Sequence, residues 1–279
     1  MWQVCRHTSR TELGDLAGVV SPRRRLLVAI VAAAVLLTLL VVVGRVVAAR
    51  GPDVDVNARP AQNVLGPVLL VPGYGGAQAA LGSLADRIRA TGRTATVIAL
   101  PENGTGDLTA QVDALSRAVD AALSAGAPSV DVVGYSAGGV VAGLWVARDD
   151  GAAKARRVVT LGSPLRGTTV AGSAVAFVPD ACPVACHQLA PGSAEVRELT
   201  TARVGRAVPW LSIWTTADQT VTPPDSARLD GAVDVALQDV CGPAPVSHGQ
   251  LPADPAVVAL VLRGLSTAPL TGQGCPANS

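Results

Sequence analysis

The stretch Val130-Asp131-Val132-Val133-Gly134-Tyr135-Ser136-Ala137-Gly138-Gly139-Val140 decides how this chain of 279 residues folds. It opens with a short apolar run, Val130–Val133, which predicts a buried strand. It continues into a helical pattern over Gly138–Arg148. Glycines stand two residues before and two residues after Ser136, and a sharp strand-to-helix turn of this kind pushes the serine hydroxyl out from the sheet edge. The stretch therefore predicts a serine-bearing strand–turn–helix unit of an α/β domain.

Strand and helix patterns alternate on both sides of this unit. Short apolar runs predict five more strands, over Val68–Val71, Thr94–Leu100, Val158–Leu161, Leu211–Thr215 and Val233–Leu237. Helical periodicity predicts helices over Ala77–Ala90, Asp107–Ser124 and Pro255–Arg263. This alternation predicts a mostly parallel sheet of about six strands, covered by helices on both faces. The segment from Ser163 to Pro209 is expected to be a long irregular loop, with a short helical signal near Ala194–Leu199.

A serine hydroxyl becomes a useful nucleophile only when a base takes its proton, and the chain has three histidines. His7 precedes a long apolar run, and His187 lies in the irregular segment. His248 follows the last predicted strand, where the base of a serine–acid–histidine site is expected. We therefore predict His248 as the base, with His187 as a loop residue or part of the pocket lining.

The acid that orients the base should lie just past the carboxyl end of a parallel strand. Asp218 follows the strand predicted over Leu211–Thr215 and is the predicted acid, with Asp225 as the reserve candidate. Two backbone amides must also face the developing oxyanion. The amide of Ala137 should supply one, and that of Tyr74, in Pro72-Gly73-Tyr74-Gly75-Gly76, the other. That loop also fits a plain glycine-rich turn, whereas the Lys and Ser/Thr of a phosphate-binding loop are absent.

These motifs and their order resemble the bacterial class 2 lipases and esterases of the α/β-hydrolase superfamily. The resemblance runs from about Pro67 to Arg263, and it also includes Val159-Thr160-Leu161-Gly162-Ser163-Pro164. It implies a minimal α/β-hydrolase fold, a Ser136–Asp218–His248 triad and hydrolysis of carboxylic esters, often acylglycerols. Many members carry a histidine where this chain has Pro72, and the compact members lack so long a segment as residues 163–209. The first departure bears on the hydrogen bonding that holds the oxyanion loop, and the second on how bulky triacylglycerols reach the site.

Composition and cysteine usage narrow the remaining possibilities. The formal net charge is +1 and no basic stripe is present, so nucleic acid is not an expected partner. Cys5 lies before the apolar run, and the other four cysteines lie after it. In an exported domain those four most simply form two disulfides. Three pairings are open, and the short spacing favours Cys182 with Cys186, leaving Cys241 for Cys275. A zinc site at the first pair lacks the usual spacing, and no metal or cofactor is expected.

The apolar run Leu26–Val43 follows three arginines, Arg23 to Arg25, and predicts a transmembrane anchor with its N-terminus in the cytoplasm. A cleaved signal peptide is the alternative, although the run is longer than the apolar region of most signal peptides. The predicted plan is a cytoplasmic segment over 1–25, an anchor over 26–47, a linker over 48–66 and the hydrolase domain over 67–279.

The predicted function is therefore an extracytoplasmic serine hydrolase acting on ester or lipid substrates. Two alternatives stay open. An envelope acyltransferase would use the same triad, and a non-catalytic membrane-anchored binding module would use only the scaffold.

Overall fold

The computed structural model describes residues 22–49, 59–76 and 78–276 of the chain. The chain divides into two compact units, Met1–Gly51 and Pro52–Ser279. In the first unit, helix α1 runs over Pro22–Ala49. No helix within the described residues is both long and apolar enough to cross a membrane, so the transmembrane anchor predicted over Leu26–Val43 is not supported. Cys5 and His7 lie outside the described residues.

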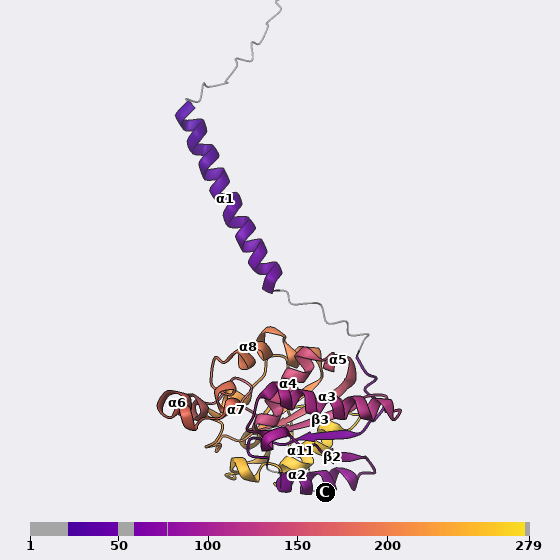
Figure 1. Cartoon of the computed structure of the whole chain (residues 1–279). Helices are drawn as coiled ribbons and strands as arrows, with labels where there is room; N and C mark the ends of the chain where they lie inside the picture. The colour runs from indigo at the N-terminus through magenta and orange to yellow at the C-terminus, as the bar shows by residue number, and fades with distance from the viewer. Residues whose placement is uncertain (1–21, 50–58, 77, 277–279) are drawn as a thin grey trace, which may run out of the picture. The chain divides into compact units, whose positions relative to one another are not determined.

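The second unit is built on a six-stranded sheet in the order β2-β1-β3-β4-β5-β6 (Figure 1). Every neighbouring pair is parallel, which confirms the sheet predicted from the sequence. The strands are β1 (Val68–Val71), β2 (Ala95–Val97), β3 (Val130–Tyr135), β4 (Ala155–Leu161), β5 (Trp210–Trp214) and β6 (Val233–Ala236). Each lies within about three residues of its predicted bounds, the usual uncertainty of strand and helix ends.

Helices cover both faces of this sheet. Helices α3 (Leu108–Ser124) and α4 (Ala137–Arg148) pack on one face, and α2 (Gln78–Arg89) and α11 (Pro255–Leu265) on the other (Figure 1). Adjacent residues of a strand point to opposite faces, so Leu69 joins the first core and Val68 the second. Strands buried on both faces explain why the sequence shows continuous apolar runs there.

The segment between β4 and β5 differs from the expected irregular loop, because it is largely helical. It contains α6 (Thr169–Phe177), η3 (Pro179–Ala181), α7 (Val184–Gln188), α8 (Ala194–Thr201) and α9 (Val204–Ala207). Helices this short show too few turns for a clear periodicity. Local caps define them instead: the side chains of Thr168 and Ser193 accept hydrogen bonds from the first turns of α6 and α8.

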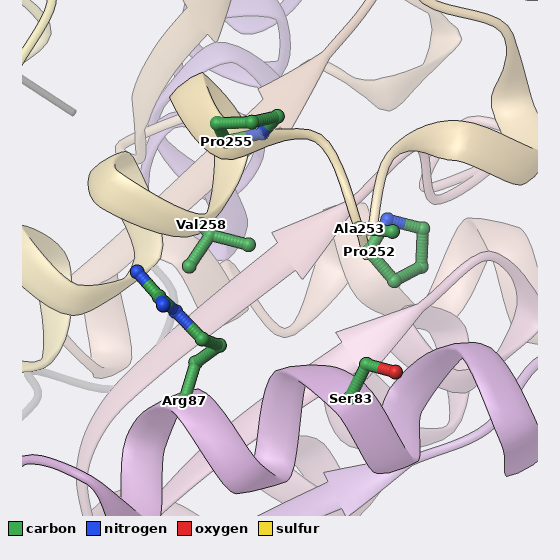
Figure 2. Close-up of a pocket in the computed structure, with 6 residues that line it drawn as sticks. All are labelled: Ser83, Arg87, Pro252, Ala253, Pro255 and Val258. Carbon is green, nitrogen blue, oxygen red and sulfur yellow. The ribbon is translucent and has the colours of Figure 1, made fainter. Parts of the chain in front are cut away.

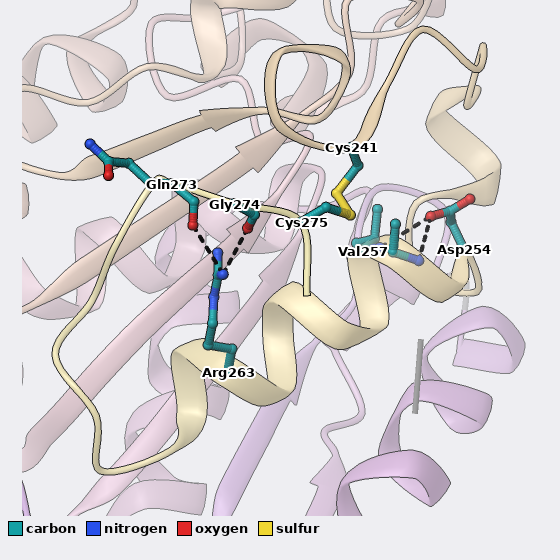
Figure 3. The surroundings of a disulfide bond; sticks show 8 residues. Cys241, Asp254, Val257, Arg263, Gln273, Gly274 and Cys275 are labelled. Atoms are coloured by element: carbon teal, nitrogen blue, oxygen red, sulfur yellow. Dashed lines mark hydrogen bonds between the residues drawn. A yellow bond between two sulfur atoms is a disulfide. The ribbon is translucent and has the colours of Figure 1, made fainter. Parts of the chain in front are cut away.

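The two disulfides have the predicted pairing. Cys182 pairs with Cys186 around the start of α7. Cys241, at the end of α10 (Leu237–Cys241), pairs with Cys275 in the C-terminal segment (Figure 3). Arg263 of α11 donates hydrogen bonds to the carbonyl oxygens of residues 273 and 274, beside that disulfide. The segment after α11 is thus fastened both to α10 and to α11 itself.

Candidate active site

Ser136 stands at the turn from β3 into α4, at the carboxyl edge of the sheet. Its φ of 54° and ψ of −127° place it in a backbone conformation that non-glycine residues rarely adopt. A methyl group on Gly138 would lie 2.2 Å from the Val71 carbonyl oxygen, and one on Gly134 would lie 2.5 Å from Gly139 Cα. Glycine is therefore required on both sides of Ser136, and the strained turn holds the serine at the edge of the sheet.

The three residues predicted to act together are in hydrogen-bond contact. Nε2 of His248 lies 3.0 Å from Oγ of Ser136, and Nδ1 of His248 lies 2.7 Å from Oδ2 of Asp218. Ser136 follows β3, Asp218 follows β5 and His248 follows β6. The parallel sheet thus brings residues from distant parts of the chain to one edge. In this order an imidazole can accept the serine proton while the carboxylate stabilises the imidazolium that forms.

Asp218 is buried, at 5% exposure, and its carboxylate is held from two sides. Oδ1 accepts hydrogen bonds from the backbone amides of Thr220 and Val221, at 2.9 and 2.8 Å. Oδ2 is left to face His248. The reserve candidate, Asp225, lies instead in the first turn of the short helix η4 (Pro224–Ala227).

His248 is fixed by its neighbours in the chain and by Tyr135. Ser247 and Gln250 form a capping box around the short helix η5 (His248–Gln250). The Tyr135 hydroxyl donates to the His248 carbonyl oxygen at 3.2 Å, and the two rings stack with centroids 5.2 Å apart. Burial, and then the negative charge of Asp218, raises the pKa of Tyr135 to about 12. The Tyr135 phenol is therefore a neutral donor that holds the backbone of His248 in place.

Gly162 is a site residue whose role sequence reasoning missed. Its φ is +51°, and a methyl group there would lie 3.1 Å from both Asp218 Oδ2 and His248 Nδ1. The Asp218–His248 pair thus packs directly against the chain just after β4. In the sequence Gly162 stands directly after the predicted strand Val158–Leu161, within the stretch Val159–Pro164 that contributes to the lipase resemblance, and neither observation assigns it a role.

The loop after β1 lies against the Ser136 turn. A methyl group on Gly73 would lie 2.8 Å from Ser136 Cβ, and the Gly76 amide donates to the Gly73 carbonyl at 3.1 Å, closing a tight turn around Tyr74. Ala137 is the first residue of α4, where amides have no carbonyl one turn earlier to bind. Both predicted oxyanion donors, the amides of Tyr74 and Ala137, thus belong to backbone next to the serine.

Other candidate features lie away from this cluster. His187 is exposed, and its Nε2 lies 3.4 Å from the Pro179 carbonyl oxygen, within the segment between β4 and β5. A cavity of about 300 Å³ opens between α2 and the start of α11, lined by Ser83, Arg87, Pro252, Ala253, Pro255 and Val258 (Figure 2). It includes none of the predicted site residues and brings no nucleophile–base pair together, so we do not assign the chemistry to it.

Neither a protein-family model nor a curated protein sequence matches this chain. Among solved structures, the chain is similar to lipase B of Aspergillus fumigatus, with 19% identity and a TM-score of 0.62 over 76% of this chain and 54% of that one. It is also similar to the mature form of the Bacillus licheniformis lipase BlEst2, with 17% identity and a TM-score of 0.60 over 75% of this chain and 94% of that one.

These similarities concern the fold. At such low identities they show that the second unit has the α/β-hydrolase fold, with its parallel sheet flanked by helices. The chain spans only about half the length of the Aspergillus lipase. The finer resemblance to bacterial class 2 lipases rests on the sequence motifs alone.

Proposed function

We propose that this protein is a serine hydrolase that cleaves carboxylic esters through an acyl-enzyme. The observation that carries the proposal is the pair of hydrogen bonds that links Ser136 to His248 and His248 to Asp218. Activation of a serine nucleophile needs a base beside its hydroxyl and a carboxylate that orients the base, and this arrangement supplies both. The lipases that share the fold make esters the natural first substrates to test.

In the proposed reaction, His248 takes the proton of Ser136 as the hydroxyl oxygen attacks the ester carbonyl carbon. The tetrahedral oxyanion accepts hydrogen bonds from the amides of Tyr74 and Ala137. The imidazolium then gives its proton to the leaving alcohol, and an acyl-Ser136 ester remains. Water, deprotonated by His248, attacks this ester and releases the acid and the free serine.

Asp218 has two tasks in this scheme. The amides of Thr220 and Val221 hold its carboxylate in place, so it fixes the His248 tautomer that leaves Nε2 free to accept a proton. Its negative charge also stabilises the imidazolium during the reaction. Because the carboxylate is buried, water screens that charge weakly.

We further propose that the domain works outside the cytoplasm. Two disulfides support this, since such bonds persist in oxidising compartments and are rare in the cytosol. Quantifying free thiols in protein isolated from its own compartment tests the point. Reaction of Cys182, Cys186, Cys241 and Cys275 as free thiols in the native protein would contradict it.

The activity test uses the full chain with its disulfides formed, and p-nitrophenyl esters from short to long acyl chains. Wild-type protein should hydrolyse at least one ester, and Ser136→Ala should reduce kcat by about 10⁴-fold or more. Ser124→Ala, at an exposed serine near the end of α3, is the matched control and should behave as wild type. Equal rates in Ser136→Ala and wild type would exclude the acyl-enzyme.

The acyl-chain preference carries further information. A preference for long chains would mark a lipase, and a preference for short chains an esterase. If a folded wild-type chain releases no p-nitrophenol, acyl transfer to an added alcohol and substrate binding without turnover become the hypotheses to test, because both would use the same scaffold.

A further inference from the structure

The loop that carries Tyr74 has a second wall besides the Ser136 turn. On that side lie residues 102–104, which belong to the short helix η2 (Pro101–Gly104). A methyl group on Gly104 would lie 3.0 Å from the Gly73 carbonyl oxygen, and one on Gly76 would lie 3.2 Å from the Asn103 carbonyl oxygen. The oxyanion loop is therefore in direct backbone contact with this second wall.

This wall has an uncommon backbone. Glu102, Asn103 and Gly104 have φ values of 49°, 50° and 74°, so three consecutive residues are left-handed. For residues other than glycine this costs about 1–2 kcal/mol each, and such geometry persists only where its surroundings enforce it. Thr105 closes the turn locally, since its amide and its hydroxyl both donate to the Glu102 carbonyl oxygen.

The segment that follows the turn is held by helix α7, which comes from the stretch between β4 and β5. The Ala185 amide donates to the Thr105 carbonyl at 3.2 Å. The side chain of Gln188 accepts from the Leu108 amide at 2.8 Å and donates to Asp107 Oδ1 at 2.8 Å. The latter bond is the largest cause that lowers the pKa of Asp107, so the carboxylate stays charged as the cap of α3.

Helix α7 is itself anchored well enough to serve as a support. Ala185 is fully buried, Leu189 nearly so, and both belong to the core on the α4 face of the sheet. The disulfide between Cys182 and Cys186 closes the turn that enters the helix. A rigid support of this kind can pass its position on to the segment that it binds.

We propose that Gln188 is a positioning residue: by fastening residues 107 and 108 to α7, it holds the left-handed turn Glu102–Gly104 against the loop that presents the Tyr74 amide. The inference rests on the proposed function, since the position of that amide matters only if it binds an oxyanion. Gln188 touches no reacting atom. Its effect is on the placement of a donor that acts in the transition state.

The first experiment compares Gln188→Ala with wild type on a short soluble ester. We expect kcat to fall about tenfold with KM changed less than twofold, because the loss of a whole oxyanion donor costs about 10²- to 10³-fold in kcat and here the donor is only displaced. Gln62→Ala is the matched control. That glutamine also binds backbone, at the Arg156 carbonyl on the opposite edge of the sheet, and its loss should leave kcat unchanged.

A second pair of variants tests the turn without touching α7. Asn103→Gly permits positive φ and should keep wild-type kcat, whereas the β-branched side chain of Asn103→Val opposes it and should lower kcat about tenfold, within the cost of a misplaced catalytic group. Equal kcat values in these two variants would overturn the proposal. So would a Gln188→Ala protein that is as active as Gln62→Ala.

Hydrogen exchange separates this proposal from the proposed function. In Gln188→Ala, the amides of residues 73–76 should exchange faster than in wild type, whereas those of residues 246–250 should not change. This measurement needs no activity. If wild-type protein cleaves no ester, the proposed function fails, yet unchanged exchange at residues 73–76 would refute the positioning by itself and faster exchange would support it.

Discussion

Polar side chains gather at both edges of the six-stranded sheet, and the two groups are built in opposite ways. At the carboxyl edge, Ser136, His248 and Asp218 form a line of two hydrogen bonds that reaches from strained backbone to a buried carboxylate. At the amino edge, Oδ2 of Asp131 in β3 forms ion pairs with the guanidinium groups of Arg93 and Arg156, with N–O distances of 2.6 and 2.5 Å. In the proposed reaction the first group moves a proton, whereas the second group holds its charges in place.

The amino-edge group ties chain segments together. Arg156 also donates to the carbonyls of residues 265 and 266, and Arg157 to those of residues 264 and 268, at the end of α11 and just after it. Burial, and then the charge of Arg156, lowers the pKa of Arg157, but a guanidinium remains charged throughout the accessible pH range. Side chains that only donate and do not titrate make permanent links. Histidine, which can accept and donate, suits the other edge.

The largest expected effect separates the two edges by activity. Asp218→Asn should lower kcat by about 10⁴-fold, because an amide cannot hold His248 in the required tautomer or stabilise its protonated form. Steady-state kinetics on a p-nitrophenyl ester measures this. Asp225→Asn removes the alternative acid and should keep kcat within twofold. A larger loss of kcat in Asp225→Asn than in Asp218→Asn would mean that Asp225, and not Asp218, is the acid that orients His248.

The reverse effect is expected at the amino edge. Asp131→Asn leaves two arginines facing a neutral amide in a fully buried site, so the free energy of unfolding should fall by about 3–5 kcal/mol. Urea denaturation measures this, and kcat of the folded protein should stay near the wild-type value. The control is Asp120→Asn, which breaks the exposed pair with Lys154 and should cost less than about 1 kcal/mol. Equal losses in both variants would mean that the buried group adds no stability.

A smaller effect is expected at Gly162, where one substitution should change both activity and stability. Gly162→Ala adds a methyl group close to both Asp218 and His248 and strains a positive φ, so it should lower both kcat and stability. Gly126→Ala has the same kind of strain, at a φ of 94°, but its methyl group meets nothing within 4 Å. Each variant should therefore lose about 1–3 kcal/mol for strain, and only Gly162→Ala should lose activity. Comparable activity in both would remove Gly162 from the site.

The sequence predicts the carboxyl edge better than the amino edge for a physical reason. The proposed chemistry needs particular residue types at strand ends, so Ser136, Asp218 and His248 can be predicted one by one, and the structure brings all three into hydrogen-bond contact. The buried strands are equally visible, because strands covered on both faces read as continuous apolar runs. Nothing in the local pattern around Asp131 marks it as the acceptor of two arginines, because its partners come from distant segments.

The same contrast explains the rest of what sequence reasoning missed. Helix α6 depends on its Thr168 cap, and α7 on the Cys182–Cys186 disulfide and on contacts with α3, whereas α9 is only four residues long; none of these leaves a periodic signal. The wall formed by residues 102–104 depends on contacts with the Gly73–Gly76 loop, which a sequence pattern does not reveal. Gly162 shows only that a strand ends there. Candidate site residues can be predicted from their residue types, whereas the segments that hold them in place are far apart in the sequence and come into contact only in the folded chain.

The smallest expected effect concerns Tyr135, the donor behind the base. Tyr74→Phe leaves Tyr135 as the sole tyrosine of the chain, so phenolate absorbance then reports this group alone, and its titration should centre on about pH 12. The folded pKa is higher than the unfolded value of about 10, so the folded protein binds the proton more tightly. The stability from this group is therefore fully present below about pH 10 and is lost as pH rises through about 12.

Tyr135→Phe should remove that part of the alkaline loss of stability and also the hydrogen bond to the His248 carbonyl, lowering stability at neutral pH by about 0.5–1.5 kcal/mol. Because the phenol acts on the backbone of His248 and not on its ring nitrogens, kcat should fall far less than in Asp218→Asn. A titration of Tyr135 centred near pH 10 would mean that the ring is solvated, and the stacked, buried support of the base would then be wrong.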